Sequence, residues 1–463
     1  MATNPNSMVQ EAVDAAISKR GEIGLQVVAY VDGKQVVDVW GGLADIPTGR
    51  QVDADTLFPV FSVTKAVTAV ALHIQAERGL VDYAMPIAHY WPEFGAHGKD
   101  KATVYDALTH RLGVPIMPLG VTPELMCDWD WMVQRIADMH PLFEPGTKAA
   151  YMSYTFGWVI GEVVRRTDPR SRQFGTFIQD EICQPLDLDS LWVGIPDAVE
   201  ARVATLTNMP PIPPGAPGMA PGALSPLAIP PQVGTTQEVF GRADVRRACL
   251  PGAGGIMNAR SAARFFAMLA QGGALDGVRL LSEERVRWFS VPRPPCDYDY
   301  VQGVPHNGSI GGFHLVASIG DAAPPLSMVA AGRNPRTFGH PGAGGSIGWA
   351  DPDTRLAVAM THNRMFRATT PEENPPFELC WKFLKAYLEE QHNAVCTSPR
   401  TCFRSAFRHG VIDHDPFWID LTVLRNFTVH TYNEDLAEYV YSRLAETARR
   451  FRAVLAAVAT ENE

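Results

Sequence analysis

A serine and a lysine three positions apart stand at the start of a helical run. The stretch Phe61–Lys65 reads Phe-Ser-Val-Thr-Lys, and apolar residues then recur at helical spacing up to Ile74 before the run stops near Gly79. Because residues three apart share one side of a helix, Ser62 and Lys65 are expected to be neighbours. The pattern also predicts that one face of this helix is buried and that Ser62 lies in its first turn.

A lysine that burial keeps neutral can take the proton of a nearby serine hydroxyl and so activate it as a nucleophile. The N-terminus of a helix adds backbone N–H groups and a positive dipole end, which favour negative charge on an attacked carbonyl oxygen. The spacing therefore indicates acyl transfer through Ser62. The alternative is an ordinary amphipathic helix with a capping serine, because Ser-x-x-Lys also arises by chance.

Tyr151 is a second candidate for the chemistry. Residues 144–150 form a turn rich in small residues, and Tyr151 follows at the entry of another apolar run that reaches Gly161. A tyrosine at this place can act as a general base if a nearby cation lowers its pKa. The commoner role of such a tyrosine is to anchor a loop.

The elements that must position these residues indicate an α+β fold. Helical spacing over residues 7–20 precedes two apolar strands, 25–31 and 34–40, joined by a two-residue Asp-Gly turn. A second hairpin is predicted within 337–360, and helical and loop segments fill most of 80–200. We therefore expect helices against an antiparallel sheet, interrupted by a helical subdomain.

One serine motif is interpreted as structural. Residues Gly344–Gly348 match the G-x-S-x-G nucleophile elbow, which needs a strand, a sharp turn and then a helix. A turn and another strand follow here instead. Ser346 is therefore not expected to be a nucleophile.

Length and composition narrow the class of protein. The 463 residues predict about two or three folding units. The net charge of -10 argues against a general binder of nucleic acid or of anionic membranes. The seven cysteines lack paired spacing and the N-terminus lacks a basic and then apolar leader, so a cytoplasmic protein with reduced thiols is expected. No cluster of His, Cys and Asp has ligand spacing, so neither a metal nor another cofactor is expected.

An uncharged stretch rich in Pro and Gly covers residues 209–233, inside a longer uncharged run from 203 to 237. The run is long enough to span a membrane, but its prolines and glycines forbid a continuous helix, so no span is expected. A loop of this length within a compact domain usually covers a site or is an insertion, which makes 209–233 a candidate lid.

Three motifs, in this order, resemble those of the serine β-lactamase and penicillin-binding-protein superfamily: Ser62–Lys65, Tyr151–Ser153 and His340–Gly342. The resemblance is closest to the class C-like branch, which includes esterases, and the segments 108–115 and 144–147 also look like this branch. It implies a β-lactamase/transpeptidase-like fold with an antiparallel sheet flanked by helices.

The resemblance also assigns roles to residues. Ser62 would be the acylated nucleophile, and Lys65 and Tyr151 would share the proton transfers. The backbone N–H groups of Ser62 and Ala343 would form the oxyanion hole.

Ser153, His340 and Gly342 are the substrate-binding positions that the resemblance implies, and two of them depart from the β-lactamase pattern. Ser153 occupies the place of an asparagine whose amide contacts the lysine and the bound acyl amide. His340 replaces a lysine that helps to bind the β-lactam carboxylate, and histidine is neutral much of the time at pH 7. A carboxylic ester hydrolase or transacylase, acting on a small-molecule ester or amide, is therefore favoured, with β-lactam hydrolysis as the alternative.

The C-terminal residues carry a different motif. Arg425, Asn426, His430 and Tyr432 match the R-x4-H-x-Y pattern of the HEPN superfamily, and residues 377–463 resemble its nucleotidyltransferase substrate-binding proteins, which are four-helix bundles. In toxin members the Arg and His carry RNA cleavage, but an inherited helix contact without activity is favoured here. The first part of the bundle is missing, so the remaining apolar faces imply a partner, either a nucleotidyltransferase or a second copy of this chain.

The sequence thus predicts a serine hydrolase domain over 1–370 and a truncated all-α module over 375–463. The hydrolase resemblance ends near Phe366, so the helix at 377–391 would pack on the hydrolase sheet or lead into a dimerised half-bundle. There are two rival hypotheses. In the first, the chain is a HEPN-type protein that acts on RNA or pairs with a nucleotidyltransferase, and its hydrolase region is inert. In the second, it is a binding protein that keeps the fold without turnover. The joint presence of Ser62, Lys65 and Tyr151 argues against an inert hydrolase region.

Overall fold

The computed structural model describes residues 5–208, 224–294, 298–303, 308–315 and 334–365. The chain divides into two units, and the one formed by Val9–Pro376 contains nearly all of the described residues. The HEPN-like positions Arg425, Asn426, His430 and Tyr432 lie outside the described residues, as does the greater part of the Pro-rich stretch.

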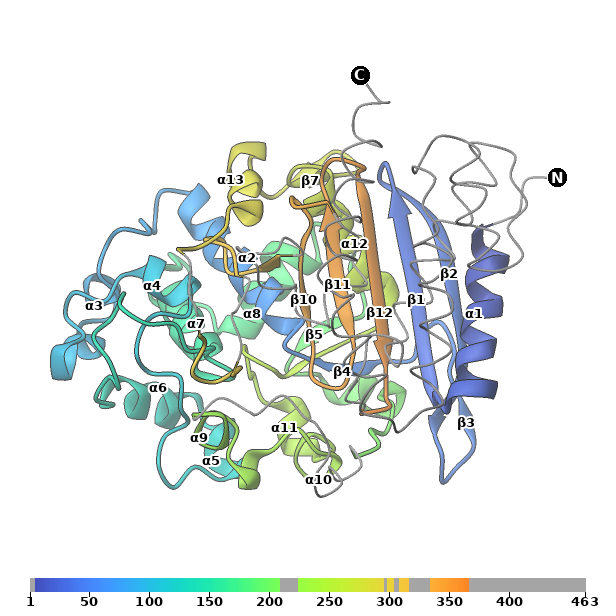
Figure 1. The fold of residues 1–463 in the computed structure, drawn as a ribbon, viewed down its shortest axis with the longest axis horizontal. Helices are drawn as coiled ribbons and strands as arrows, with labels where there is room; N and C mark the ends of the chain where they lie inside the picture. Colours follow the sequence, from blue (N-terminus) through green and yellow to red (C-terminus); the bar gives the residue numbers. More distant parts are fainter. Residues whose placement is uncertain (1–4, 209–223, 295–297, 304–307, 316–333, 366–463) are drawn as a thin grey trace, which may run out of the picture. The chain divides into compact units, whose positions relative to one another are not determined.

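Seven antiparallel strands form the main sheet, in the order β3-β2-β1-β12-β11-β10-β9 (Figure 1). They are β1 (Gly24–Val31), β2 (Lys34–Asp45), β3 (Arg50–Gln51), β9 (His314–Leu315), β10 (Phe338–Pro341), β11 (Ile347–Asp351) and β12 (Leu356–His362). Both predicted hairpins are confirmed. In the first, Asp32 and Gly33 have φ of 49° and 74°, the left-handed turn that matches the twist of the strands.

Two smaller sheets and the helices complete the described fold. Strand β4 (Phe58–Phe61) pairs with β6 (Gly255–Met257), which pairs with β5 (Leu191–Val193), and β7 (Ala274–Leu275) pairs with β8 (Val278–Arg279). The α-helices are α1 (Pro5–Arg20), α2 (Thr64–Glu77), α3 (Ile87–Tyr90), α4 (Val104–Leu108), α5 (Pro123–Cys127), α6 (Trp129–Ala137), α7 (Thr155–Thr167), α8 (Phe174–Ile178), α9 (Ser225–Ala228), α10 (Gln237–Phe240), α11 (Ala243–Arg247), α12 (Ala259–Ala270) and α13 (Glu283–Arg287).

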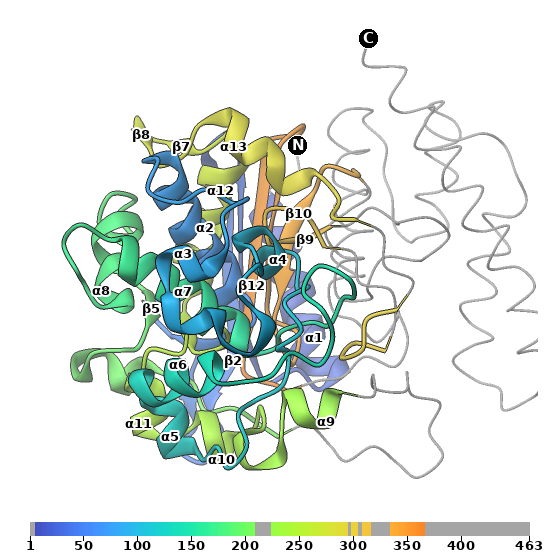
Figure 2. The same ribbon diagram turned by 90° about the vertical axis from the view of Figure 1, so that its left-hand side faces the viewer.

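Helices cover both faces of the main sheet (Figures 1 and 2). On one face Arg260 of α12 lies over the ring of Trp40, at 5.3 Å, and pairs with Asp38. Successive residues of a strand point to opposite faces, so Gly41 faces the other side. There a Cβ would lie 2.9 Å from Cδ1 of Ile17, which shows how closely α1 packs on β2.

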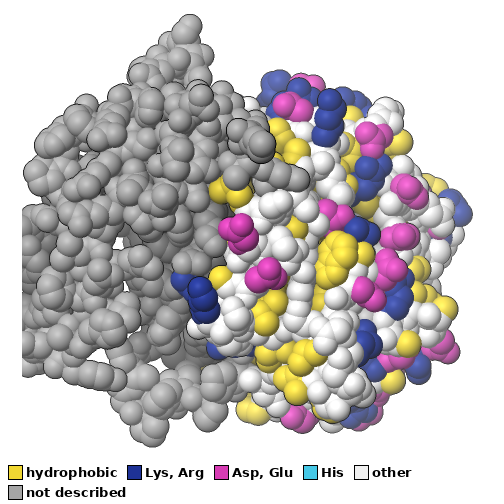
Figure 3. Space-filling view, turned by 90° about the vertical axis from the view of Figure 1, so that its right-hand side faces the viewer, with side chains coloured by type: hydrophobic (Ala, Val, Ile, Leu, Met, Phe, Trp, Pro, Cys, Tyr) yellow, Lys and Arg dark blue, Asp and Glu magenta, His cyan; other side chains and the backbone are white. Residues whose placement is uncertain are grey.

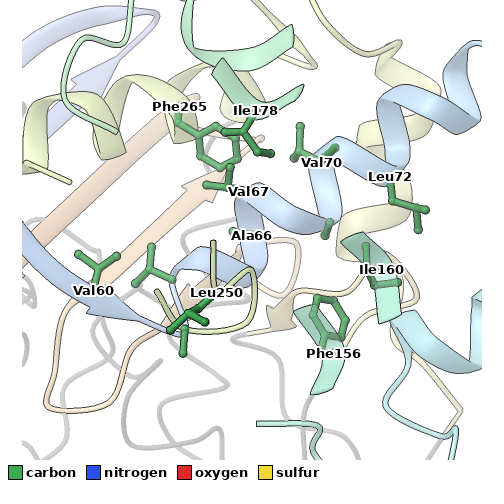
Figure 4. Packing of buried hydrophobic residues seen from close by; sticks show 14 of the residues in the cluster. Val60, Ala66, Val67, Val70, Leu72, Phe156, Ile160, Ile178, Leu250 and Phe265 are labelled. Atoms are coloured by element: carbon green, nitrogen blue, oxygen red, sulfur yellow. The ribbon is translucent and has the colours of Figure 1, made fainter. Parts of the chain in front are cut away.

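The helix α2 is the centre of the core. Every residue from Thr64 to Ala76 is buried, so the prediction of a single buried face was wrong. The reason is that α2 is enclosed from several directions, by Phe156 and Ile160 of α7, Ile178 of α8 and Phe265 of α12 (Figure 4). Its polar side chains are hydrogen-bonded inside, as Thr68 is to the carbonyl of Pro251 at 2.6 Å.

Ser346 is structural, as predicted. It is 2% exposed, it precedes strand β11 and not a helix, and its Oγ accepts the backbone N–H of His362 at 3.2 Å.

The surface of the described residues mixes both signs of charge. Acidic and basic side chains are interspersed on the face that looks out from the right of Figure 1 (Figure 3). None of the described helices combines the length and the apolar composition that crossing a bilayer requires.

Candidate active site

Ser62 lies in the turn between β4 and α2. Phe61, the last residue of β4, has φ of 47°, a left-handed conformation that is uncommon for a bulky residue and turns the chain sharply. The sequence predicted Ser62 within the first turn of the helix, but α2 begins at Thr64, so Ser62 lies just before the helix. The Oγ of Thr64 accepts the N–H of Gly255 at 2.8 Å and so ties the turn to β6.

Lys65 is buried directly beside this serine. Its Nζ lies 2.9 Å from Oγ of Ser62, 2.6 Å from the carbonyl oxygen of Ser153 and 2.8 Å from that of Gly252. The side chain is completely buried, and burial holds the pKa of Lys65 well below its usual range. The neighbourhood of Ser62 and Lys65 that spacing predicted is therefore present.

The carbonyl of Gly252 reaches Lys65 only because two glycines let a loop approach α7. A Cβ at Gly252 would lie 2.5 Å from the carbonyl oxygen of Tyr154, and a Cβ at Gly157 would lie 2.0 Å from the nitrogen of Gly252. The role of Gly252 was not predicted from the sequence. A Pro-Gly-Ala-Gly-Gly run at residues 251–255 was the only signal, and such a run usually marks a turn.

Tyr151 is buried, and its phenol interacts with the Ser62 side chain. Burial raises the pKa of Tyr151 above its usual value, although the interaction with Ser62 opposes this. The phenol therefore stays protonated at neutral pH. This differs from the expectation that a nearby cation would lower the pKa: Nζ of Lys65 lies 4.9 Å from the ring centroid, but that amine is itself driven toward neutrality by burial.

Two further residues contact the backbone around Tyr151, and sequence analysis gave neither a role. His110 accepts from the N–H groups of Ala150 and Met152, and Asp299 accepts from that of Tyr151 at 3.0 Å. His110 lies in the segment 108–115, which resembles the family, but the resemblance assigned no role to this residue. Asp299 is far from Tyr151 in the chain and carried no signal.

The substrate side of the site contains two buried polar atoms that have no partner among the described residues. His340, on β10, is completely buried, and its Nδ1 lies 2.8 Å from the carbonyl oxygen of Pro341. Within the described part of the chain neither Nε2 of His340 nor Oγ of Ser153 has a hydrogen-bond partner. Burial lowers the pKa of His340 well below its usual value and that of neighbouring His314, at 4.4 Å between rings, to about 3. Both rings are therefore neutral at pH 7.

The turn after β10 lies against the end of β4. A Cβ at Gly342 would be 2.2 Å from the carbonyl oxygen of Val60, so only glycine fits where this turn passes close to the Ser62 turn. Among the described residues, no group accepts a hydrogen bond from the backbone N–H of Ser62 or of Ala343. Within the described part of the chain, both N–H groups thus meet the condition that the predicted oxyanion hole requires.

Comparison with known proteins identifies the family. Residues 9–380 match the family model Beta-lactamase, and the chain belongs to that family. It is 36% identical over 352 residues to Esterase/beta-lactamase LipL of Mycobacterium tuberculosis, covering 74% of this chain and 77% of that protein. A solved family VIII carboxylesterase is 29% identical with a TM-score of 0.71, and a penicillin-binding-protein homologue from Caulobacter crescentus is 30% identical with a TM-score of 0.70. Each comparison covers 82% of this chain and 98% of that structure.

These similarities confirm the α+β β-lactamase/transpeptidase fold of the hydrolase region and make the chain a β-lactamase-related, carboxylesterase-like serine hydrolase. Residues 375–459 match a second family model, Nucleotidyltransferase substrate binding protein like, as the C-terminal motif predicted. The hydrolase match extends to residue 380, beyond the end near Phe366 given by sequence analysis, and overlaps the second match over 375–380.

Proposed function

We propose that this chain is a carboxylic ester hydrolase or transacylase that works through an acyl-enzyme on Ser62, with Lys65 as the base. The observation that carries the proposal is the set of three oxygens around Nζ of Lys65. Two of them, from Ser153 and Gly252, are carbonyls that can only accept hydrogen bonds. The third is the Ser62 hydroxyl, which can also donate.

This arrangement directs the lone pair of a neutral Lys65 amine toward the hydroxyl of Ser62. A neutral amine has two N–H bonds and one lone pair. The two carbonyls take the N–H bonds, so the lone pair is left for the O–H of Ser62 at 2.9 Å. Burial favours that neutral form, so the serine proton has an acceptor in place before the substrate arrives.

The reaction then follows as two acyl transfers. Oγ of Ser62 forms a bond to the ester carbonyl carbon while its proton passes to Nζ of Lys65, and the N–H groups of Ser62 and Ala343 bind the oxyanion. The protonated phenol of Tyr151 gives its proton to the leaving alcohol oxygen as the ester C–O bond breaks, and the Lys65 ammonium restores it. Water or a second alcohol attacks the acyl-enzyme by the same steps in reverse.

The substrate side supports an ester rather than a β-lactam. A buried, neutral His340 supplies no positive charge for a carboxylate, and the Oγ of Ser153 replaces an amide. β-Lactam hydrolysis stays as the second candidate, because the 36% identical relative carries both activities in its name.

The test is the initial rate on p-nitrophenyl butyrate for the wild type and for Ser62→Ala, with nitrocefin in parallel. Ser282→Ala is the matched control, because that serine caps helix α13 and donates to Glu77 at the far end of α2 from Ser62. We expect ester turnover that Ser62→Ala abolishes and Ser282→Ala retains, with slower or no nitrocefin hydrolysis. Equal ester rates in the wild type and Ser62→Ala would contradict the proposal, and faster nitrocefin hydrolysis would favour the second candidate.

For residues 375–459 we propose a binding role, toward a nucleotidyltransferase or a second copy of this chain. The match to a substrate-binding family supports it. Sedimentation of the full chain alone and with a small nucleotidyltransferase tests it. A monomer in both samples would contradict it.

A further inference from the structure

The backbone of the Tyr151 segment is held from two sides. On one side the carbonyl oxygen of His110 accepts the N–H of Ala150 at 3.0 Å, and Nδ1 of His110 accepts the N–H of Met152 at 3.1 Å. On the other side Oδ1 of Asp299 accepts the N–H of Tyr151 at 3.0 Å. Three consecutive N–H groups, with that of Tyr151 in the middle, are thus bound by just two residues.

His110 can offer two acceptors because of its backbone conformation. Its φ of 58° lies in the left-handed region, where Asn, Asp and His are the commonest side chains after Gly. The ring packs against Tyr151, at 4.7 Å between centroids, and against Phe156 at 4.9 Å. The residue therefore contacts both the backbone beside Tyr151 and the ring of Tyr151.

The bond from Met152 fixes the state of the imidazole. Nδ1 can accept only if it carries no hydrogen, so the ring must be neutral with its proton on Nε2. Burial lowers the pKa of His110 well below its usual value, and the positive charge of nearby Arg293 acts in the same direction, so the surroundings favour this neutral state. Protonation on Nδ1 would remove the acceptor from the Met152 N–H.

We propose that His110 is a positioning residue whose Nδ1 holds the Met152 N–H and thereby sets the phenol of Tyr151 against Ser62. The inference rests on the proposed function, in which that phenol is the proton donor. A phenol displaced by about 1 Å would lose on the order of a hundredfold in rate, because proton transfer needs a hydrogen-bonded geometry. His110 itself touches no reacting atom in this account.

Asp299 holds the Tyr151 segment from the other side, and it is itself fixed by several contacts. Its Oδ1 also accepts the N–H groups of Val301 and Gln302, each at 2.9 Å, and Arg293 lies 4.0 Å from Oδ2. Arg293 in turn donates to the carbonyl oxygen of Thr109, the neighbour of His110. The two sides are therefore joined through one buried arginine.

The experiment compares His110→Asn with His110→Gly. Both replacements tolerate the left-handed backbone and both remove the ring, but only asparagine keeps an acceptor, its Oδ1, near the place of Nδ1. The readouts are kcat and KM on p-nitrophenyl butyrate, together with amide hydrogen exchange of the peptide that covers residues 149–153. Should His110→Gly not fold, His110→Gln takes its place, because its amide reaches to the position of Nε2 instead.

We expect kcat of His110→Gly to be about tenfold or more below that of His110→Asn, with the KM values within about threefold of each other. The 149–153 peptide should exchange faster in His110→Gly. Equal kcat in the two variants, or equal exchange of the peptide, would overturn the inference. A wild type without Ser62-dependent turnover would instead overturn the proposed function, and the exchange measurement alone would then decide the positioning role.

Discussion

Two buried lysines, in different regions of the molecule, have almost the same surroundings. Lys65 and Lys99 are both fully buried, and each Nζ contacts three oxygens. At Lys99 all three are backbone carbonyls, from Ala96, Ala137 and Met139. At Lys65 one of the three is a hydroxyl.

That single difference separates a structural lysine from a candidate base. Three carbonyls demand three N–H bonds, so they hold Lys99 as an ammonium, and burial lowers its pKa only to about 8 while nearby Asp138 opposes the shift. Two carbonyls and a hydroxyl let Lys65 lose a proton and still satisfy every oxygen. The number of groups around a buried amine that can only accept hydrogen bonds therefore decides whether the amine stays protonated or can act as a base.

Replacement of the two lysines gives the largest expected effects. Lys65→Met should lower kcat for ester hydrolysis by about a thousandfold or more, since no base remains for Ser62. Its free energy of unfolding should change by less than about 1 kcal/mol, because removal of the buried amine offsets two lost hydrogen bonds.

Lys99→Met is the matched control and should behave in the opposite way. Its kcat should stay within about twofold of wild type, while the free energy of unfolding falls on the order of 3 kcal/mol, because three carbonyls lose a charged donor. Esterase assays and urea unfolding of both variants check the pair. Loss of activity in both, or in neither, would break the comparison.

The same contrast holds for two buried tyrosines. The phenol of Tyr151 interacts with the Ser62 side chain, whereas the hydroxyl of Tyr154 donates to the carbonyl of Val233 at 2.8 Å. Tyr151→Phe should lower kcat by about a hundredfold or more, because the proton donor to the leaving group is lost. Tyr154→Phe should cost about 1 kcal/mol of stability and leave kcat within about twofold. Steady-state kinetics and thermal melts of the two variants distinguish the roles, and an unchanged kcat in Tyr151→Phe would refute its catalytic role.

Two buried serines extend the comparison between catalytic-site and structural residues, and their replacement should have smaller effects on activity and stability. Oγ of Ser153 has no partner among the described residues, whereas that of Ser346 accepts the His362 N–H. Ser153→Ala should leave stability unchanged within about 0.5 kcal/mol and raise KM by about two- to fivefold, because the free hydroxyl is expected to bind substrate. Ser346→Ala should lower stability by about 1 kcal/mol at unchanged KM. A KM for Ser153→Ala equal to that of the wild type would remove Ser153 from the binding site.

Local patterns made the framework of the fold predictable. Alternating apolar residues and an Asp-Gly turn gave the β1–β2 hairpin, and the three-residue spacing gave the contact of Ser62 with Lys65. The burial of α2 on all sides was not predictable in this way, because it depends on α7, α8 and α12, which come later in the chain. A periodic pattern records one apolar face and cannot show that polar side chains such as Thr68 are bonded inside.

The residues that hold Lys65 and Tyr151 in place come from distant parts of the chain and could not be predicted from local patterns. His110, Gly252 and Asp299 contribute a ring nitrogen, a carbonyl oxygen and a carboxylate, and none of these residue types is rare enough to stand out in a sequence. The catalytic roles, the domain boundaries and the cytoplasmic location stay predictions, as does the assignment of Arg425 and His430, which lie outside the described residues.

The most direct test of a neutral Lys65 is the pH dependence of Ser62 phosphonylation by a fluorophosphonate, compared between the wild type and Lys65→Met. The neutral amine is the active form, so the rate should fall as the pH drops through the Lys65 pKa. Because burial lowers that pKa, the midpoint should lie well below the ordinary lysine value of about 10.4, with a plateau above it. Lys65→Met should react far more slowly and show no such midpoint. A wild-type rate that still rises near pH 10, or the same profile in both proteins, would contradict the account.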